Sequence, residues 1–110
     1  MRIIIVALAI CVSASSVGAT FVSGNLLYQN CGKSALESEQ ALCTGYLSAI
    51  ADAMEDGDMI DGFRACVPSA ANTGQLRDLL LQHLDTNQLY RHYNASTILA
   101  RFFAETFPCT

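Results

Sequence analysis

The clearest folding signal lies in residues 95–109, which read ASTILARFFAETFPC. Large apolar side chains recur there at spacings of three and four residues, as on one face of an amphipathic α-helix. They are Ala95, Ile98, Leu99, Phe102, Phe103 and Phe107. Pro108 and Cys109 follow directly and end the helix. The stretch therefore predicts a C-terminal helix whose aromatic face has to be covered by other elements of the chain.

A third helix is expected just upstream of this stretch. It begins after Pro68, where Asn72 and Gln75 form a start resembling a capping box, and it ends at residues 85–87. Its predicted buried stripe consists of Leu76, Leu79, Leu80, His83 and Leu84. For His83, this position predicts a histidine in or beside the core.

Two further helical segments precede residues 55–64, a polar stretch broken by Gly57 and Gly62. A second helix is expected over residues 39–54, and a short first element over residues 20–31, with Ser23 as its cap. The apolar face of the second helix consists of Cys43, Tyr46, Leu47, Ile50 and Met54, and that of the first of Leu26, Leu27 and Cys31.

No segment alternates apolar and polar residues with the period of two that marks a half-buried strand. The prediction is an all-α domain, a small disulfide-stapled bundle of about four helices. A core of this size is small, so cross-links would contribute substantially to its stability.

The first nineteen residues have the composition of a secretory signal peptide. Met1 and Arg2 precede the apolar run 3–12, and small residues follow up to Val17-Gly18-Ala19. The apolar run is shorter than the roughly 18 residues of a membrane-spanning helix. We expect cleavage after Ala19, export to the periplasm and no membrane attachment afterwards, leaving residues 20–110 as the mature domain.

Four cysteines stay in the mature chain, and an even number in a small exported domain is typical of disulfides. Four cysteines allow three pairings. Cys66 precedes the third helix and Cys109 ends the fourth, so an antiparallel helix pair brings them together. The loop after Cys31 lets the chain return to Cys43 early in the second helix. The expected bonds are Cys31–Cys43 and Cys66–Cys109.

The charge and the motifs exclude several classes of function. The 110 residues carry a net charge of −4, which becomes −5 after signal removal, so a nucleic-acid partner is not expected. Residues 55–62 are acidic, but counted from Asp56 they miss the calcium-loop ligands at three positions. We expect no metal site and no cofactor. With the cysteines paired and no nucleophile motif present, we expect no enzymatic activity and no catalytic residues.

A set of spaced motifs resembles the Rap family of type VI secretion immunity proteins, which are related in role to the Tai immunity proteins. The motifs run in this order: Cys43-x-Gly45-Tyr46, Asp52, Cys66-x-Pro68, Gly74-Gln75-Leu76, Arg91-His92, Ala95 and Phe107-Pro108-Cys109. The resemblance covers residues 25–109 and implies an exported, all-helical, disulfide-containing protein. It also implies that the chain binds and blocks a secreted peptidoglycan amidase effector. The segment 85–88 departs from the family, which more often has a His-Pro-rich sequence there.

Six residues in two loops are the candidate contacts with such an effector. Asp56, Asp58 and Asp61 can steer the chain toward a basic partner, while Tyr90 and Tyr93, with Arg91 between them, can supply contact area. The alternative is that both loops are merely solvated connections. Other open alternatives are an orphan periplasmic binding module, an acid-stress chaperone, a carrier of an apolar ligand, and a homodimeric form of the protein.

Overall fold

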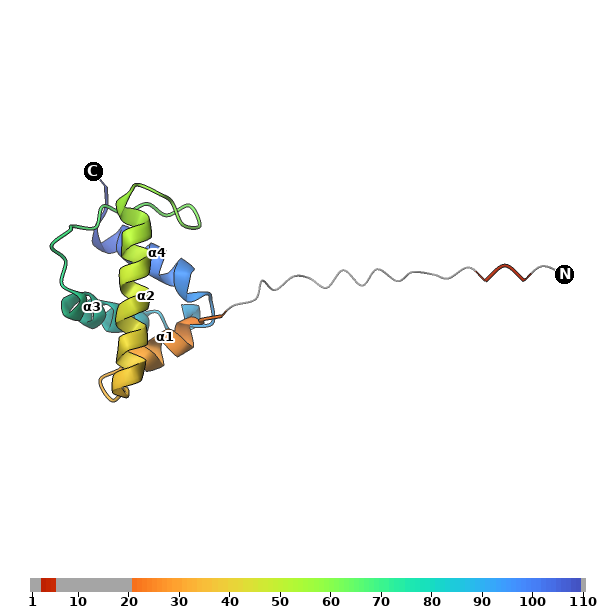
Figure 1. Cartoon of the computed structure of the whole chain (residues 1–110), viewed down its shortest axis with the longest axis horizontal. Coiled ribbons are helices and arrows are strands. Elements are labelled where there is room, and N and C mark those ends of the chain that lie inside the picture. The colour runs from red at the N-terminus through yellow and green to blue at the C-terminus, as the bar shows by residue number, and fades with distance from the viewer. Residues whose placement is uncertain (1–2, 6–20, 110) are drawn as a thin grey trace.

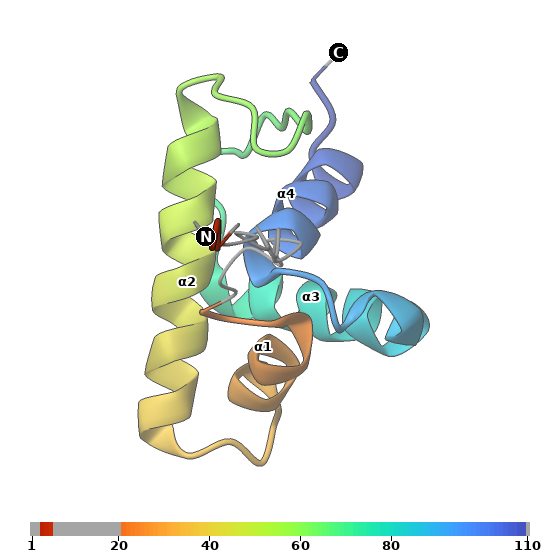
Figure 2. The same cartoon turned by 90° about the vertical axis from the view of Figure 1, so that its right-hand side faces the viewer.

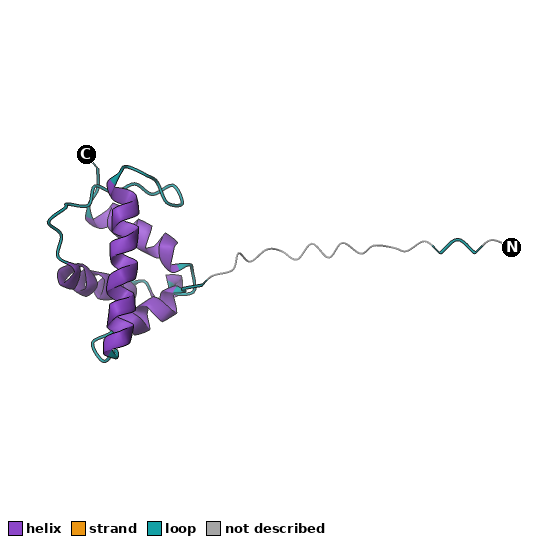
Figure 3. Cartoon of the chain, in the orientation of Figure 1, coloured by secondary structure: helices purple, strands orange, loops and turns teal. Residues whose placement is uncertain are grey.

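The computed structural model describes residues 3–5 and 21–109, and its helices are the elements expected from the sequence. They are α1 (Gly24–Cys31), α2 (Glu37–Glu55), α3 (Thr73–Thr86) and α4 (Ala95–Thr106), with a short 3₁₀ turn, η1 (Gln88–Tyr90), before α4 (Figures 1 and 3). The described residues form no strand beyond isolated bridges, which confirms the all-α class. The expected cleavage site after Ala19 lies outside the described residues.

Helix α2 forms one layer of the fold, and the other three helices form the second. It is the longest helix, with 19 residues, and it contacts α1, α3 and α4. Figure 2 shows α2 along one side of the molecule and α1, α3 and α4 on the other side. The core lies between these two layers, because each helix turns its apolar face toward the other layer.

The core contains most of the side chains that the helical spacing predicted. Phe103, Leu99, Leu80 and Leu47 are completely enclosed, and Tyr46 lies half-buried at the edge. The full buried set consists of Leu27, Cys31, Cys43, Leu47, Met54, Ala65, Leu76, Leu80, Leu84, Ala95, Ile98, Leu99, Ala100, Phe102 and Phe103.

Two leucines predicted to be buried are instead partly exposed. Leu26 keeps 40% and Leu79 keeps 43% of its surface accessible to solvent. In α3 the positions facing the other helices are Leu76, Leu80 and Leu84, and the neighbouring residue packed against the core is Leu81 rather than Leu79. The prediction for Leu26 and Leu79 was wrong because the apolar face of each helix is wider than the part of it that the neighbouring helices cover.

The helices begin where local hydrogen bonds replace the missing intrahelical ones. The Ser23 hydroxyl accepts from the Leu26 amide at 3.2 Å, and the Asn72 side chain accepts from the Gly74 amide at 2.8 Å. At the start of α2 the side chain of Glu39 accepts from the Leu36 amide at 3.0 Å. The expected caps at Ser23 and Asn72 are confirmed, whereas α2 begins two residues earlier than predicted.

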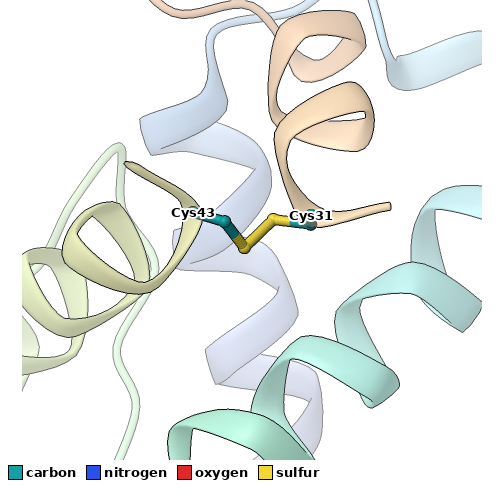
Figure 4. The surroundings of a disulfide bond; sticks show 2 residues. All are labelled: Cys31 and Cys43. Atoms are coloured by element: carbon teal, nitrogen blue, oxygen red, sulfur yellow. A yellow bond between two sulfur atoms is a disulfide. The ribbon is translucent and has the colours of Figure 1, made fainter. Parts of the chain in front are cut away.

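Two disulfides join the elements in the pairs expected from the sequence. Cys31 and Cys43 are fully buried and connect the end of α1 to α2 across a Cα–Cα distance of 5.2 Å (Figure 4). Cys66 and Cys109 are exposed, with their Cα atoms 5.1 Å apart, and they fasten the C-terminal segment to the chain before α3. The Cys31–Cys43 bond is therefore part of the core, and the Cys66–Cys109 bond lies at the surface.

A short antiparallel contact ties the start of α1 to the start of α4. The Gly24 amide donates to the Tyr93 carbonyl, and the Ala95 amide donates to the Val22 carbonyl, both at 2.9 Å. Because these two bonds enclose the end of the loop before α4, they fix its backbone against the N-terminal part of the fold. This loop carries three of the six candidate contact residues.

Candidate functional site

Residues 87–94, which we name the tyrosine loop, are anchored to the fold by the side chain of Arg91. Its Nε donates to the Leu84 carbonyl at 2.9 Å, and its guanidinium lies 3.8 Å from the centre of the Tyr28 ring. A terminal nitrogen also lies 3.5 Å from the Asp85 carboxylate. Only 17% of the Arg91 side chain is exposed, so its contacts hold the loop to α1 and the end of α3.

Asp85 and Tyr28 complete this anchor. The Tyr28 hydroxyl donates to Oδ1 of Asp85 at 2.5 Å, and Asp85 also pairs with Arg91. The hydrogen bond to the carboxylate raises the pKa of Tyr28 above its usual value, since losing the proton would place two negative charges side by side. The three side chains therefore form a linked polar cluster beneath the tyrosine loop.

The two tyrosines of the loop form a half-exposed stacked pair. Their ring centres lie 5.8 Å apart, and Tyr90 keeps 42% and Tyr93 keeps 49% of its surface exposed. The guanidinium of Arg101 on α4 lies 4.8 Å from the Tyr90 ring centre, and His92 packs against Tyr93. Tyrosines exposed in this way offer rigid contact area with hydroxyl groups at the rim.

Residues 56–64, the acidic loop, contain a tight turn that the sequence analysis missed. The backbones of Ile60 and Phe63 exchange hydrogen bonds of 3.1 and 2.9 Å, and the two residues between them, Asp61 and Gly62, have φ angles of +50° and +81°. Positive φ at both central positions is typical of a type I′ turn, for which Asp-Gly is a favoured pair. The Asp61-Gly62 dipeptide was therefore the available signal.

The acidic loop meets α4 beside the tyrosine loop. The Thr97 hydroxyl of α4 donates to the Asp61 carboxylate, although the two residues lie 36 positions apart in the sequence. Asp56 and Asp58 are exposed nearer the end of α2, where Asp56 is the C-cap. Of the three predicted acidic contacts, Asp61 therefore lies beside α4 near the tyrosine loop. Asp56 and Asp58 lie at the other end of the acidic loop.

A small pocket opens where the two loops and α4 meet. It has a volume of about 160 Å³, and its lining includes side chains from both loops, from α4 and from α3. The lining residues are Phe63, His83, Tyr90, Tyr93, Thr97, Ile98 and Arg101. Sequence reasoning missed Phe63, Thr97 and Arg101, and only the spacing of Thr97 and Arg101 by one helical turn on α4 could have suggested a shared face.

His83 lines this pocket from α3. Its ring packs edge-on against Phe102 at 5.6 Å, and its Nδ1 lies 3.8 Å from the Glu105 carboxylate. Burial lowers the pKa of His83 below its usual value, because the surrounding protein solvates the charged imidazolium poorly, while Glu105 opposes this shift. The sequence prediction of a histidine at the boundary of the core is confirmed.

Larger openings lie elsewhere on the described residues, and one of about 490 Å³ lies between α3 and α4. A groove of about 640 Å³ between α1 and α3 is lined in part by Tyr28, Lys33 and Asp78. Within residues 3–5 and 21–109, no group of three His, Cys, Asp or Glu side chains could hold a metal ion. No helix in this part of the chain has the length and apolar character needed to cross a bilayer. The two loops carry all six predicted contact residues and share a pocket with α4, so they are the candidate site for binding a partner.

Comparison with models of protein families matches residues 23–109 to the model described as Rap1a immunity proteins. The matched segment contains all four helices, both disulfides, the acidic loop and the tyrosine loop. Searches of curated proteins and of solved structures found no match.

Proposed function

Because the chain belongs to the Rap1a immunity protein family, with its immunity function against secreted effectors, we propose that it is the periplasmic inhibitor of a type VI secretion peptidoglycan amidase. The proposed mechanism is stoichiometric binding that blocks the effector, without catalysis by this chain. The amidase class of the target comes from the sequence resemblance. The geometry of the two loops supports the proposed binding surface.

Two features support a periplasmic location. Residues 1–19 have the pattern of a secretory signal, and both disulfides join cysteines of the mature segment. Disulfides persist in oxidising compartments such as the bacterial periplasm, where a peptidoglycan amidase also meets its substrate. An inhibitor placed there can protect the cell wall directly.

The observation that carries the binding proposal is the stacked, half-exposed tyrosine pair on an anchored loop beside the acidic loop. Tyr90 and Tyr93 are stacked on each other, and the loop that bears them is held by Arg91 and by backbone bonds to α1. A surface that is already ordered loses little conformational entropy on binding. In this proposal Tyr90 and Tyr93 contact the effector, whereas Arg91 acts mainly by positioning them.

The acidic residues give the surface its proposed charge preference. Asp56, Asp58 and Asp61 are all exposed, and the mature chain carries a net charge of −5. Charges of one sign speed encounter with a surface of the opposite sign and disfavour partners with like charge. We therefore expect the effector to present a basic rim around its binding site.

Inhibition of a purified amidase tests the proposal, with candidate effectors taken from amidase genes beside the gene for this chain. Peptidoglycan digestion should stop at a near-equimolar amount of the oxidised protein. Reversing Asp56 and Asp58 to lysine should weaken inhibition by about tenfold or more, because like charges would face the basic rim. Asp61 is left intact in this variant, since its bond to Thr97 belongs to the fold.

The matched control reverses Glu37 and Asp78, which are also exposed and lie on α2 and α3 away from the acidic loop. This variant makes the same change in net charge and should inhibit nearly as well as the wild-type chain. Equal weakening by both variants would remove the acidic loop from the interface and leave only a general effect of charge. Digestion that continues at a large excess of wild-type chain would contradict the inhibitory function.

A further inference from the structure

The pocket between the acidic loop, the tyrosine loop and α4 has a size that restricts what can occupy it. Its volume is about 160 Å³. Pockets that enclose a cofactor or a drug-sized molecule usually measure about 300–1,000 Å³. The space therefore suits a single large side chain of a protein partner better than a separate small-molecule ligand.

The walls of the pocket favour an apolar occupant. Phe63 and Ile98 contribute hydrocarbon surface, and the half-exposed Tyr90 and Tyr93 also line the pocket. His83 also lines the pocket, and burial lowers its pKa, so its charged form is disfavoured there. An aromatic or aliphatic side chain entering here would exchange water for apolar contacts on several sides.

The rim of the pocket favours positive charge on either side of that occupant. The Asp61 carboxylate lies against Thr97, which itself lines the pocket. The one lining guanidinium, that of Arg101, is already paired with the Glu105 carboxylate at 2.9 Å. Two carboxylates, Asp61 and Glu105, therefore accompany the one guanidinium beside the pocket, and Asp56 and Asp58 add negative charge at the far part of the acidic loop.

We propose that this pocket receives one aromatic or aliphatic side chain, carried on a basic segment of the effector, and that this side chain anchors the interface. The inference rests on the proposed inhibitory function and specifies its partner chemistry. Protein interfaces commonly concentrate their binding energy in a few side chains that fill well-packed pockets near the centre. The stacked tyrosines then surround the anchor and exclude water from it.

Short peptides test the pocket chemistry without any effector. The probes are acetylated and amidated tripeptides of sequence Lys-Phe-Lys, Lys-Ala-Lys and Glu-Phe-Glu, titrated into the uniformly ¹⁵N-labelled oxidised protein while amide resonances are followed by NMR. Lys-Phe-Lys should shift resonances of Phe63, Tyr93 and Thr97 and bind about tenfold or more tightly than Lys-Ala-Lys, because only the former buries a large apolar side chain. Glu-Phe-Glu should bind more weakly than Lys-Phe-Lys, because its charges oppose Asp61.

Two outcomes of the titration would overturn the inference. Equal binding of Lys-Phe-Lys and Lys-Ala-Lys would show that no side chain enters the pocket. Shifts confined to the groove between α1 and α3, lined in part by Tyr28 and Lys33, would place the peptide elsewhere.

A pair of variants then tests the pocket in the complex with the effector. Tyr93→Ala removes one wall while keeping the backbone carbonyl that accepts from Gly24, and it should weaken effector binding by about tenfold or more. Leu89→Ala is the control, since Leu89 is on the same loop, is 83% exposed and does not line the pocket, and it should change binding less than about twofold.

These measurements separate the pocket inference from the proposed function. Unchanged effector binding by Tyr93→Ala would overturn the pocket as the anchor while leaving the inhibitory function in place. Binding of Lys-Phe-Lys at the pocket, combined with no binding of any neighbouring amidase, would support the pocket chemistry and overturn the amidase as its partner.

Discussion

Replacing Gly24 with alanine should destabilise the fold, because the first residue of α1 lies against the tyrosine loop with no room for a methyl group. A Cβ atom at this position would lie 2.4 Å from Cδ1 of Ile98, 2.5 Å from the Arg91 carbonyl oxygen and 2.8 Å from the Arg91 Cα. Two of these three atoms belong to the backbone, so no side-chain rotation can relieve both contacts. The start of α1 would have to move away from the loop.

The size of the effect follows from two contributions. Forcing an extra carbon into a well-packed site costs about 1–3 kcal/mol of folding free energy. Moving α1 would also weaken the 2.9 Å bond from the Gly24 amide to the Tyr93 carbonyl, and a hydrogen bond of this kind contributes about 0.5–1.5 kcal/mol. We expect Gly24→Ala to lower the free energy of unfolding by about 1.5–4.5 kcal/mol in total.

The same substitution at Gly45 provides a control of opposite sign. Gly45 lies inside α2, and nothing is found within 4 Å of the position that its Cβ would occupy. Alanine there should stabilise the protein by about 0.5–1 kcal/mol, because glycine loses more conformational entropy in a helix. Urea unfolding of the oxidised proteins, followed by circular dichroism, measures both changes. A Gly24→Ala variant as stable as the wild type would refute the close approach of α1 to the tyrosine loop.

Three further predictions concern the remaining structural features. The exposed Cys66–Cys109 bond should be reduced by mild reductant before the buried Cys31–Cys43 bond. Alkylation and mass spectrometry would show the order, and simultaneous reduction of both bonds would contradict the difference in burial. Because burial lowers the pKa of His83, the unfolded chain binds this proton more readily, so the stability present above the ordinary value of 6.5 should be lost as the pH falls from 6.5 through the lowered value. His83→Gln should remove that part of the pH dependence of unfolding, although the nearby Glu105 and Arg101 charges remain. Arg91→Lys keeps the charge but loses the hydrogen bond from Nε to the Leu84 carbonyl and the stacking over the Tyr28 ring. Urea unfolding should show a free energy of unfolding lower by about 1–2 kcal/mol, and a variant as stable as the wild type would argue against the anchor.

The helices and their caps were predictable because their signals are local. The spacing of apolar residues located α4 from Ala95 onward, and short polar side chains marked the starts of α1 and α3 at Ser23 and Asn72. The disulfide pairs followed from the order of the helices. Each of these inferences needed only residues close together in the sequence, or the simplest antiparallel arrangement of neighbouring helices.

The candidate site was harder to predict because it depends on contacts between distant segments. Periodicity placed Leu79 on an apolar face, but it could not say which part of that face α1 and α2 would leave uncovered. Nothing local connects Asp61 with Thr97, since their hydrogen bond spans 36 residues. The sequence analysis placed Arg91 among the candidate effector contacts, and only the folded arrangement shows that its side chain lies on Tyr28.

Calorimetric titration of the neighbouring amidase with the purified, oxidised chain tests the central claim most directly, when paired with a digestion assay on the same samples. The account predicts saturation at a near-equimolar ratio and loss of peptidoglycan cleavage at that same ratio. Tight binding with cleavage unaffected, or no heat of binding with any neighbouring amidase, would contradict the claim that this chain blocks such an effector.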